Sequence, residues 1–79
     1  MLTVRYFAGA RAAAGVSTEQ VAATSVDELL DALVARHGER LAVVLKAAAF
    51  LVDGLACHDR GAPLTDGATV DVLPPFAGG

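Results

Sequence analysis

The residues with the clearest capacity for chemistry lie at the end of the sequence, where Gly79 carries the α-carboxylate after Gly78. At pH 7 this group is ionised, because the pKa of an α-carboxyl is about 3.5, and a carboxylate can attack a phosphorus centre. Once joined to AMP it would be an electrophile, and a sulfur nucleophile could displace the nucleotide to leave a thiocarboxylate. We therefore predict that Gly79 is the reactive residue of the chain.

The residues before the terminus favour delivery of this carboxylate to another protein. Pro74 and Pro75 restrict the backbone at the base of the tail, whereas glycine, which lacks Cβ, can enter a channel too narrow for other residues. An extended tail of this length reaches about 20 Å. We expect the segment 74–79 to insert into the active site of a partner, through Pro74, Pro75, Ala77 and Gly78.

Other residues that could take part in catalysis or ligand binding have simpler structural explanations. Neighbours on a strand point to opposite faces, so Cys57 and His58 are not expected to meet as thiol and base. We expect a small buried thiol beside a solvated histidine, and His37 suits the dipole at the end of a helix. Zinc-site spacing is missing, as is a glycine-rich phosphate loop. The chain is therefore expected to bind no metal and no cofactor, and ATP would be used by an activating partner.

Composition narrows the class of protein further. Its 79 residues make one domain, 1–79, with no room for a second core. The net charge of −3 and the scattered basic residues argue against nucleic-acid binding, and no apolar stretch is long enough to cross a membrane. The single cysteine excludes an internal disulfide and favours a reducing compartment. We expect a cytoplasmic protein whose partners are other proteins.

The first third of the chain predicts two strands. Alternation of apolar and polar residues over 2–8 is typical of a half-buried strand, and it places Phe7 on the face opposite to Tyr6. Residues 9–15 form an alanine-rich connector with room for one helical turn. Residues 16–24 predict a second strand, antiparallel to the first because the connection is short.

The strongest local pattern predicts a helix over Val26–His37. Ser25 and Glu28 form a capping box, in which hydroxyl and carboxylate each accept a backbone N–H, and apolar residues follow at helical spacing. Gly38 can adopt the left-handed conformation that ends a helix. Residues 39–46 predict a second, shorter helix.

The remaining segments predict three strands and hence the fold. Residues 49–52 and 55–58 are separated by an Asp-Gly turn, and residues 68–73 form the last strand, with Thr69 and Asp71 pointing to water. Two antiparallel hairpins around one amphipathic helix favour an α+β protein, in which the helix crosses a mixed sheet of about five strands. The first and last strands would be parallel central neighbours, as in the β-grasp fold of ubiquitin-like proteins.

Apolar residues outside the expected core indicate an interface. Phe76 lies beyond the last strand, Phe7 has the parity of the free face of the sheet, and Leu64 precedes an exposed turn. Exposed apolar groups gathered on one face are typical of a protein interface. Alternatively, Phe7 and Phe76 cover each other as a small separate cluster.

Three segments of the chain resemble the MoaD/ThiS sulfur carriers, most closely the small subunits of molybdopterin synthases. The segments are residues 4–8 with Arg11 and Gly15, residues 63–67, and residues 73–79. The Pro-Pro-x-x-Gly-Gly ending, which follows an Asp-Gly-x-x-Val strand, is the most specific of them. The resemblance runs over the whole chain.

The resemblance implies that an E1-like enzyme adenylates Gly79 and that a sulfurtransferase system converts it to a thiocarboxylate. The tail then enters the large subunit of molybdopterin synthase and donates sulfur to cyclic pyranopterin monophosphate, in molybdenum cofactor biosynthesis. Because each product needs two sulfurs, a heterotetramer of two small and two large subunits is expected. Gly78 and Gly79 carry over directly, as does Phe7 for the interface. Arg11 belongs to the same expected interface, and Phe76 replaces a smaller residue common at its position.

Three alternatives keep the same fold. The sulfur chemistry could serve thiazole formation for thiamine, or cysteine synthesis, although the Pro-Pro pair favours molybdopterin over the thiamine carriers. A protein of a different class would be a ubiquitin-like modifier, joined through Gly79 to lysine amines of its targets. The third alternative is a β-grasp binding domain with an inert end, whose function would be unchanged by deletion of Gly79.

Overall fold

The computed structural model describes residues 1–75 of the chain. The elements are, in chain order, β1 (Leu2–Tyr6), α1 (Gly9–Ala14), β2 (Thr18–Val21), α2 (Val26–His37), α3 (Glu39–Ala47), β3 (Ala49–Val52), β4 (Leu55–Cys57) and β5 (Thr69–Leu73). The predicted order of strands and main helices is confirmed.

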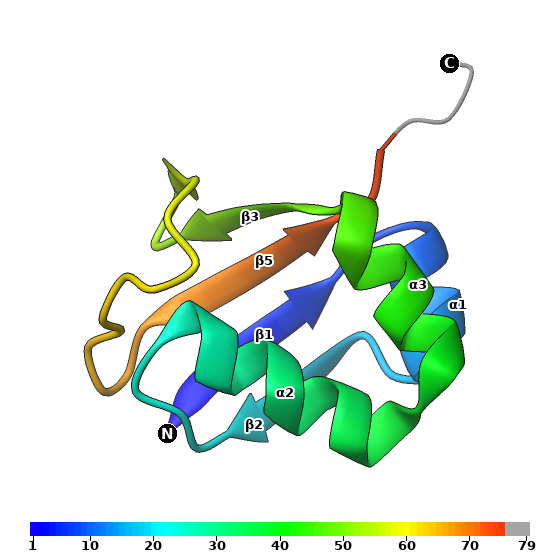
Figure 1. Ribbon diagram of the computed structural model, residues 1–79, viewed down its shortest axis with the longest axis horizontal. Helices are drawn as coiled ribbons and strands as arrows, with labels where there is room; N and C mark the ends of the chain where they lie inside the picture. The colour runs from blue at the N-terminus through cyan, green and yellow to red at the C-terminus, as the bar shows by residue number, and fades with distance from the viewer. Residues whose placement is uncertain (76–79) are drawn as a thin grey trace.

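A mixed sheet of five strands forms one layer, and the helices cover one of its faces (Figure 1). The strand order is β2-β1-β5-β3-β4. The first and last strands pair in parallel at the centre, with Tyr6 opposite Val72, and the other three pairings are antiparallel. This arrangement is the predicted ubiquitin-like β-grasp fold, with α2 crossing the sheet.

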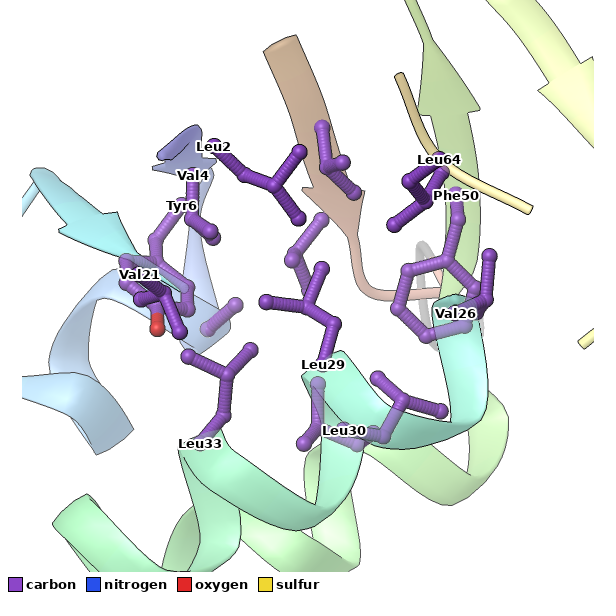
Figure 2. Close-up of a cluster of buried hydrophobic side chains, with 14 of the residues drawn as sticks. Leu2, Val4, Tyr6, Val21, Val26, Leu29, Leu30, Leu33, Phe50 and Leu64 are labelled. Carbon is purple, nitrogen blue, oxygen red and sulfur yellow. The ribbon is translucent and has the colours of Figure 1, made fainter. Parts of the chain in front are cut away.

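The core lies between the sheet and α2. Inward residues of β1 and β5, including Val4 and Val72, are fully buried, and α2 contributes Leu29 and Leu33 to the same cluster (Figure 2). Burial of one such aliphatic side chain contributes roughly 1.5–3 kcal/mol. This layer therefore supplies the main stabilisation of the small domain.

Helix α2 begins and ends at the predicted residues, and only the conformation of its C-terminal cap differs from prediction. Ser25 Oγ accepts the Glu28 N–H at 3.2 Å, as predicted. The Glu28 carboxylate accepts the N–H of Thr24 at 3.2 Å and its hydroxyl at 3.1 Å, so both side chains accept a backbone N–H as predicted. Gly38 ends the helix with φ of +89° and ψ of −167°, which is not the left-handed helical conformation. Its N–H donates to Val34 O at 2.7 Å.

Two N-terminal elements also differ from prediction. The connector after β1 is a six-residue helix, α1, closed by Gly15 at φ of +80°. Strand β2 has only four residues, within the predicted 16–24. Its C-terminal side is shorter because Thr24 takes part in the cap of α2.

A polar cluster closes the core at the edge strand β2. The register places Glu19 on the covered side, opposite Val4. Its carboxylate accepts hydrogen bonds from Tyr6 Oη at 2.6 Å, Arg36 Nη1 at 2.7 Å and His37 Nε2 at 2.5 Å. Burial alone would raise the pKa of Glu19, but the three hydrogen bonds outweigh it and hold that pKa below its ordinary value. The cluster fastens β2 to the last turn of α2.

Within residues 1–75, no helix has the length and apolar character needed to cross a membrane.

Candidate functional site

The candidate site begins where β5 ends and the tail starts. Leu73 is the last residue of β5 and pairs with Ala49 of β3. Pro74 follows, half-buried, and then Pro75, which is exposed. Proline has no N–H to donate to a neighbouring strand, so the two residues mark the end of sheet pairing. The predicted tail residues Phe76, Ala77, Gly78 and Gly79 lie outside the described part of the chain.

Phe7 lies at the same end of the sheet as the base of the tail. It follows β1 directly, and its N–H donates to Val72 O at 3.2 Å. The ring is half-buried, and the Arg5 guanidinium carbon is 5.6 Å from its centroid. A cation at this distance over an aromatic ring is attracted by the ring face. The structure therefore brings Phe7 and Pro74 to the same end of the sheet. An interface that includes both residues requires this arrangement.

An ion pair on the free face of the sheet was missed by sequence reasoning. Arg5 Nε lies 2.6 Å from Asp71 Oδ1, and Nη2 lies 2.8 Å from Oδ2. The Asp71 side chain is only 9% exposed, so its predicted orientation toward water was wrong. The carboxylate does point to the free face, but Arg5 covers it. The carboxylate raises the pKa of Arg5 by hydrogen bonding and by its charge.

Apolar side chains lie on the β3 and β4 side of this ion pair, whereas Thr18 of β2 lies opposite Arg5 on its other side. The register places Leu51 of β3 beside Asp71, Ala56 of β4 beyond Leu51, and Ala49 opposite Leu73. A patch of apolar residues with little uncompensated charge is typical of the centre of a protein interface. We call these residues, with Arg5, Phe7 and Asp71, the free-face patch. Its use as an interface remains a prediction.

Leu64 does not belong to that surface. It is 9% exposed and lies within the core cluster with Phe50 and Val26 (Figure 2). Its N–H donates to Thr24 O at 2.8 Å, next to an isolated bridge between Ser25 and Pro63. These long-range contacts turn the side chain inward, so the predicted exposure was wrong. Leu64 is therefore withdrawn from the interface.

Arg11 lies on α1 and is exposed. Only Ala8 separates Phe7 from helix α1. Arg11 therefore follows closely after the end of the sheet at which the tail begins. The expected contact of Arg11 with a partner remains a prediction.

The thiol of Cys57 is less buried than predicted, and the neighbouring His58 is solvated as predicted. Cys57 is half-buried on β4, and its Sγ lies 3.5 Å from Asp59 O, whereas His58 is exposed. Among residues 1–75, no three His, Cys, Asp or Glu side chains are grouped to hold a metal ion. The main feature of the candidate site is therefore the position at which the tail leaves β5, beside the free-face patch.

A model of the ThiS family matches residues 4–79. The chain belongs to the ThiS family. Solved structures agree with this assignment. SAMP1 from Haloferax volcanii is 27% identical, with a TM-score of 0.84 over 99% of this chain and 98% of that chain. The resemblance to MoaD/ThiS sulfur carriers is thus confirmed.

Two further similar structures are complexes with a second protein. A chain in the complex of subunits 1 and 2 of the molybdopterin-converting factor from Helicobacter pylori 26695 is 26% identical, with a TM-score of 0.73, covering 99% of this chain and 97% of that chain. A chain of the Amycolatopsis orientalis BexX/CysO complex is 22% identical, with a TM-score of 0.80 over 100% of both chains, and shows the shared fold. No curated protein matches this ThiS-family chain.

Proposed function

We propose that this ThiS-family chain is the sulfur-carrier subunit of a molybdopterin synthase. The observation that carries the proposal is the exit of the tail beside Phe7 and the free-face patch. A partner docked on this patch would receive the tail at a fixed point. The 26% identical chain from the Helicobacter pylori complex of subunits 1 and 2 of molybdopterin-converting factor supports this choice of partner.

The chemistry begins at the carboxylate of Gly79. In an E1-like enzyme, a carboxylate oxygen attacks the α-phosphorus of ATP, pyrophosphate leaves, and an acyl adenylate forms. A sulfur nucleophile then attacks the acyl carbon and AMP leaves, which gives the thiocarboxylate. The E1-like enzyme supplies the ATP site, because the described part of this chain offers no glycine-rich phosphate loop.

The loaded tail enters the large synthase subunit and donates its sulfur to cyclic pyranopterin monophosphate. The thiocarboxylate sulfur replaces an oxygen substituent on a substrate carbon to give a thioester, and water then cleaves the bond between this sulfur and the Gly79 acyl carbon, which leaves the sulfur on the product and returns the Gly79 carboxylate for another cycle. Glycine at the tip matters because a channel that excludes water has little room for a side chain. Since two sulfurs enter each product, a heterotetramer of two small and two large subunits is the expected assembly.

Two measurements test the proposal. Incubation with an E1-like enzyme, ATP and a sulfur donor should raise the intact mass by the difference between sulfur and oxygen, and a variant lacking Gly79 should not change. Mixing with a large synthase subunit should give a complex with the mass of a heterotetramer by light scattering. A chain that gains sulfur but forms no such complex would support a carrier for thiamine or cysteine synthesis instead.

A second candidate function is a ubiquitin-like modifier. Structures of the small archaeal modifier protein 1 from Haloferax volcanii are 26% and 27% identical to this chain over nearly its whole length. A modifier would form an amide between Gly79 and a lysine of a target protein. Covalent adducts that carry a Gly-Gly remnant on lysine after proteolysis would favour this function, and a mass gain of sulfur alone would favour the carrier.

A further inference from the structure

A hollow of about 280 Å³ opens between the end of α3, the beginning of β3 and the segment that follows β4. Its wall is largely apolar, and two exposed side chains, an imidazole and a guanidinium, stand at its edge. The lining residues that matter here are Ala49, Phe50, Leu51, Ala56, His58 and Arg60. Within residues 1–75, no aspartate or glutamate lines the hollow.

The hollow adjoins the free-face patch. Ala49, Leu51 and Ala56 belong to both. A protein docked on the patch would therefore also cover one side of the hollow and exclude water from it. The volume suits a side chain of such a protein, since pockets for independent small ligands are usually about 300–1,000 Å³ and enclose most of the ligand.

Arg60 supplies positive charge to the hollow. Its guanidinium carbon lies 5.5 Å from the centroid of the Phe50 ring, and one weak hydrogen bond, at 3.5 Å, joins Nη2 to Leu45 O. Within residues 1–75, Arg60 forms no ion pair with a carboxylate. The neighbouring Asp59 does not line the hollow, and its carboxylate accepts the Gly61 N–H at 2.9 Å. The guanidinium therefore has N–H groups available for a ligand.

The other arginine of this surface is already paired. Arg5, in the free-face patch, donates two hydrogen bonds to Asp71. Among the residues that form the patch and the hollow, all within 1–75, Arg60 is thus the arginine without a carboxylate partner. An unpaired cation at the margin of an apolar surface favours a partner that brings the opposite charge.

We infer that this hollow receives an aspartate or glutamate side chain, next to an apolar residue, from the protein that docks on the free-face patch. The apolar residue packs on the wall that contains Leu51, and the carboxylate accepts hydrogen bonds from Arg60. A carboxylate suits a planar guanidinium, because two N–H groups can donate to its two oxygens. The inference rests on the proposed function for its choice of partner, the large synthase subunit, and adds the chemistry of a second contact on that subunit.

Titration of the isolated full-length chain with phenylacetate tests the site directly. This probe carries an apolar ring one methylene group from a carboxylate, and phenylacetamide is its uncharged analogue. Phenylacetate should shift the NMR amide resonances of Leu51 and Cys57 with saturation, and phenylacetamide should bind about fivefold more weakly, as expected for loss of a partly exposed ion pair.

The same titration in two arginine variants locates the charge. The affinity for phenylacetate should fall about fivefold in Arg60→Gln and stay unchanged in Arg40→Gln. Arg40 is the matched control because it is exposed on α3, forms no ion pair within residues 1–75 and does not line the hollow.

Binding of the large synthase subunit tests the site in the complex. Arg60→Gln should raise the Kd about fivefold at low salt, and Arg60→Glu should raise it further, because two carboxylates would then face each other. At 1 M salt, where the Debye length is about 3 Å, the Kd values of the wild type and Arg60→Gln should converge. Phenylacetate should weaken wild-type binding by competition.

Equal affinities for phenylacetate and phenylacetamide, or equal effects of Arg60→Gln and Arg40→Gln, would overturn the inference. So would tighter binding of phenylacetate by a chain that ends at Pro75, since the occupant would then be the chain's own terminus, or probe affinity that changes with protein concentration, which would indicate a second copy. Failure of the proposed function is distinguishable, because the wild type would then form no complex with the large subunit. The phenylacetate titration of the isolated chain would still confirm or overturn the carboxylate site.

Discussion

The guanidinium of Arg5 and the carboxylate of Asp71 form two hydrogen bonds across the central parallel strands β1 and β5. A planar guanidinium matches a carboxylate with both of its donors, so the pair fixes orientation as well as distance. The same guanidinium lies over the Phe7 ring. One ion pair thus fastens the strand that carries the tail to the strand that carries Phe7.

Removal of the Asp71 charge should destabilise the domain. In Asp71→Asn the side-chain amide would turn an N–H group toward the guanidinium donors of Arg5 and would lose the charge, so the paired hydrogen bonds would weaken, although solvent at the half-exposed Arg5 side chain screens the pair. Urea denaturation at pH 7 should show a lower midpoint for Asp71→Asn than for the wild type. Asp31→Asn is the control, because Asp31 is exposed on α2, and it should leave the midpoint nearly unchanged. Equal midpoints for wild type and Asp71→Asn would contradict the role of the pair.

Truncation of Phe7 should weaken binding to a large synthase subunit. Phe7→Ala removes an aromatic anchor beside the base of the tail, and truncation of such an anchor costs more than about 1 kcal/mol. We expect a Kd about tenfold higher, which corresponds to about 1.4 kcal/mol. Val43→Ala removes a side chain that is 65% exposed on α3 and should bind like the wild type. Binding of Phe7→Ala with wild-type affinity would show that the interface lies elsewhere.

The Glu19 cluster should make stability depend on acid. The folded-state pKa of Glu19 is lowered, so its contribution is present above the unfolded pKa, about 4.3, and is lost as pH falls through the folded pKa. Glu19→Gln should be less stable than the wild type at pH 7, and the difference should shrink toward pH 3. Urea midpoints at both pH values measure this. Glu39→Gln, at an exposed position on α3, should show no such convergence.

Tyr6 should resist ionisation in the folded protein. Burial first, and then the hydrogen bond to Glu19, raise its pKa above the ordinary value. The stability that this gives is complete below the unfolded pKa of about 10 and is lost as pH rises above it. Because Tyr6 is the only tyrosine, its ultraviolet absorbance reports on one group. Phenolate should appear only together with loss of the circular dichroism signal, and its appearance in a fully folded chain would contradict this prediction.

Local patterns were sufficient to predict most of the fold. Helix α2 followed from its capping residues and apolar spacing, and the strands followed from alternation, because these signals act over a few residues. Asp71 was wrongly predicted to face water. The alternation along a strand shows which face of the sheet a side chain lies on, but it does not show which side chain lies beside it on the next strand. The parallel pairing of β1 with β5 was predicted, but its register, which puts Arg5 opposite Asp71, was not.

The other errors have the same physical origin. Leu64 is turned inward by contacts to residues about forty positions away in the chain, at Thr24 and Ser25, which no local window contains. Glu19 had a usable signal, since it is a charged residue on the inward parity of a strand. Its partners, Arg36 and His37, could be found only once β2 and the end of α2 were placed together.

Strand β5 is held on both sides, by β1 and by β3, and the tail continues directly from it. Force applied to the tail would run along the strand axis, so both flanking ladders would share the load in shear instead of opening one bond at a time. A partner that pulls on the tail would therefore have to shear two strand pairings at once before β5 could leave the sheet. The folded domain should therefore resist unfolding when a partner pulls on its tail.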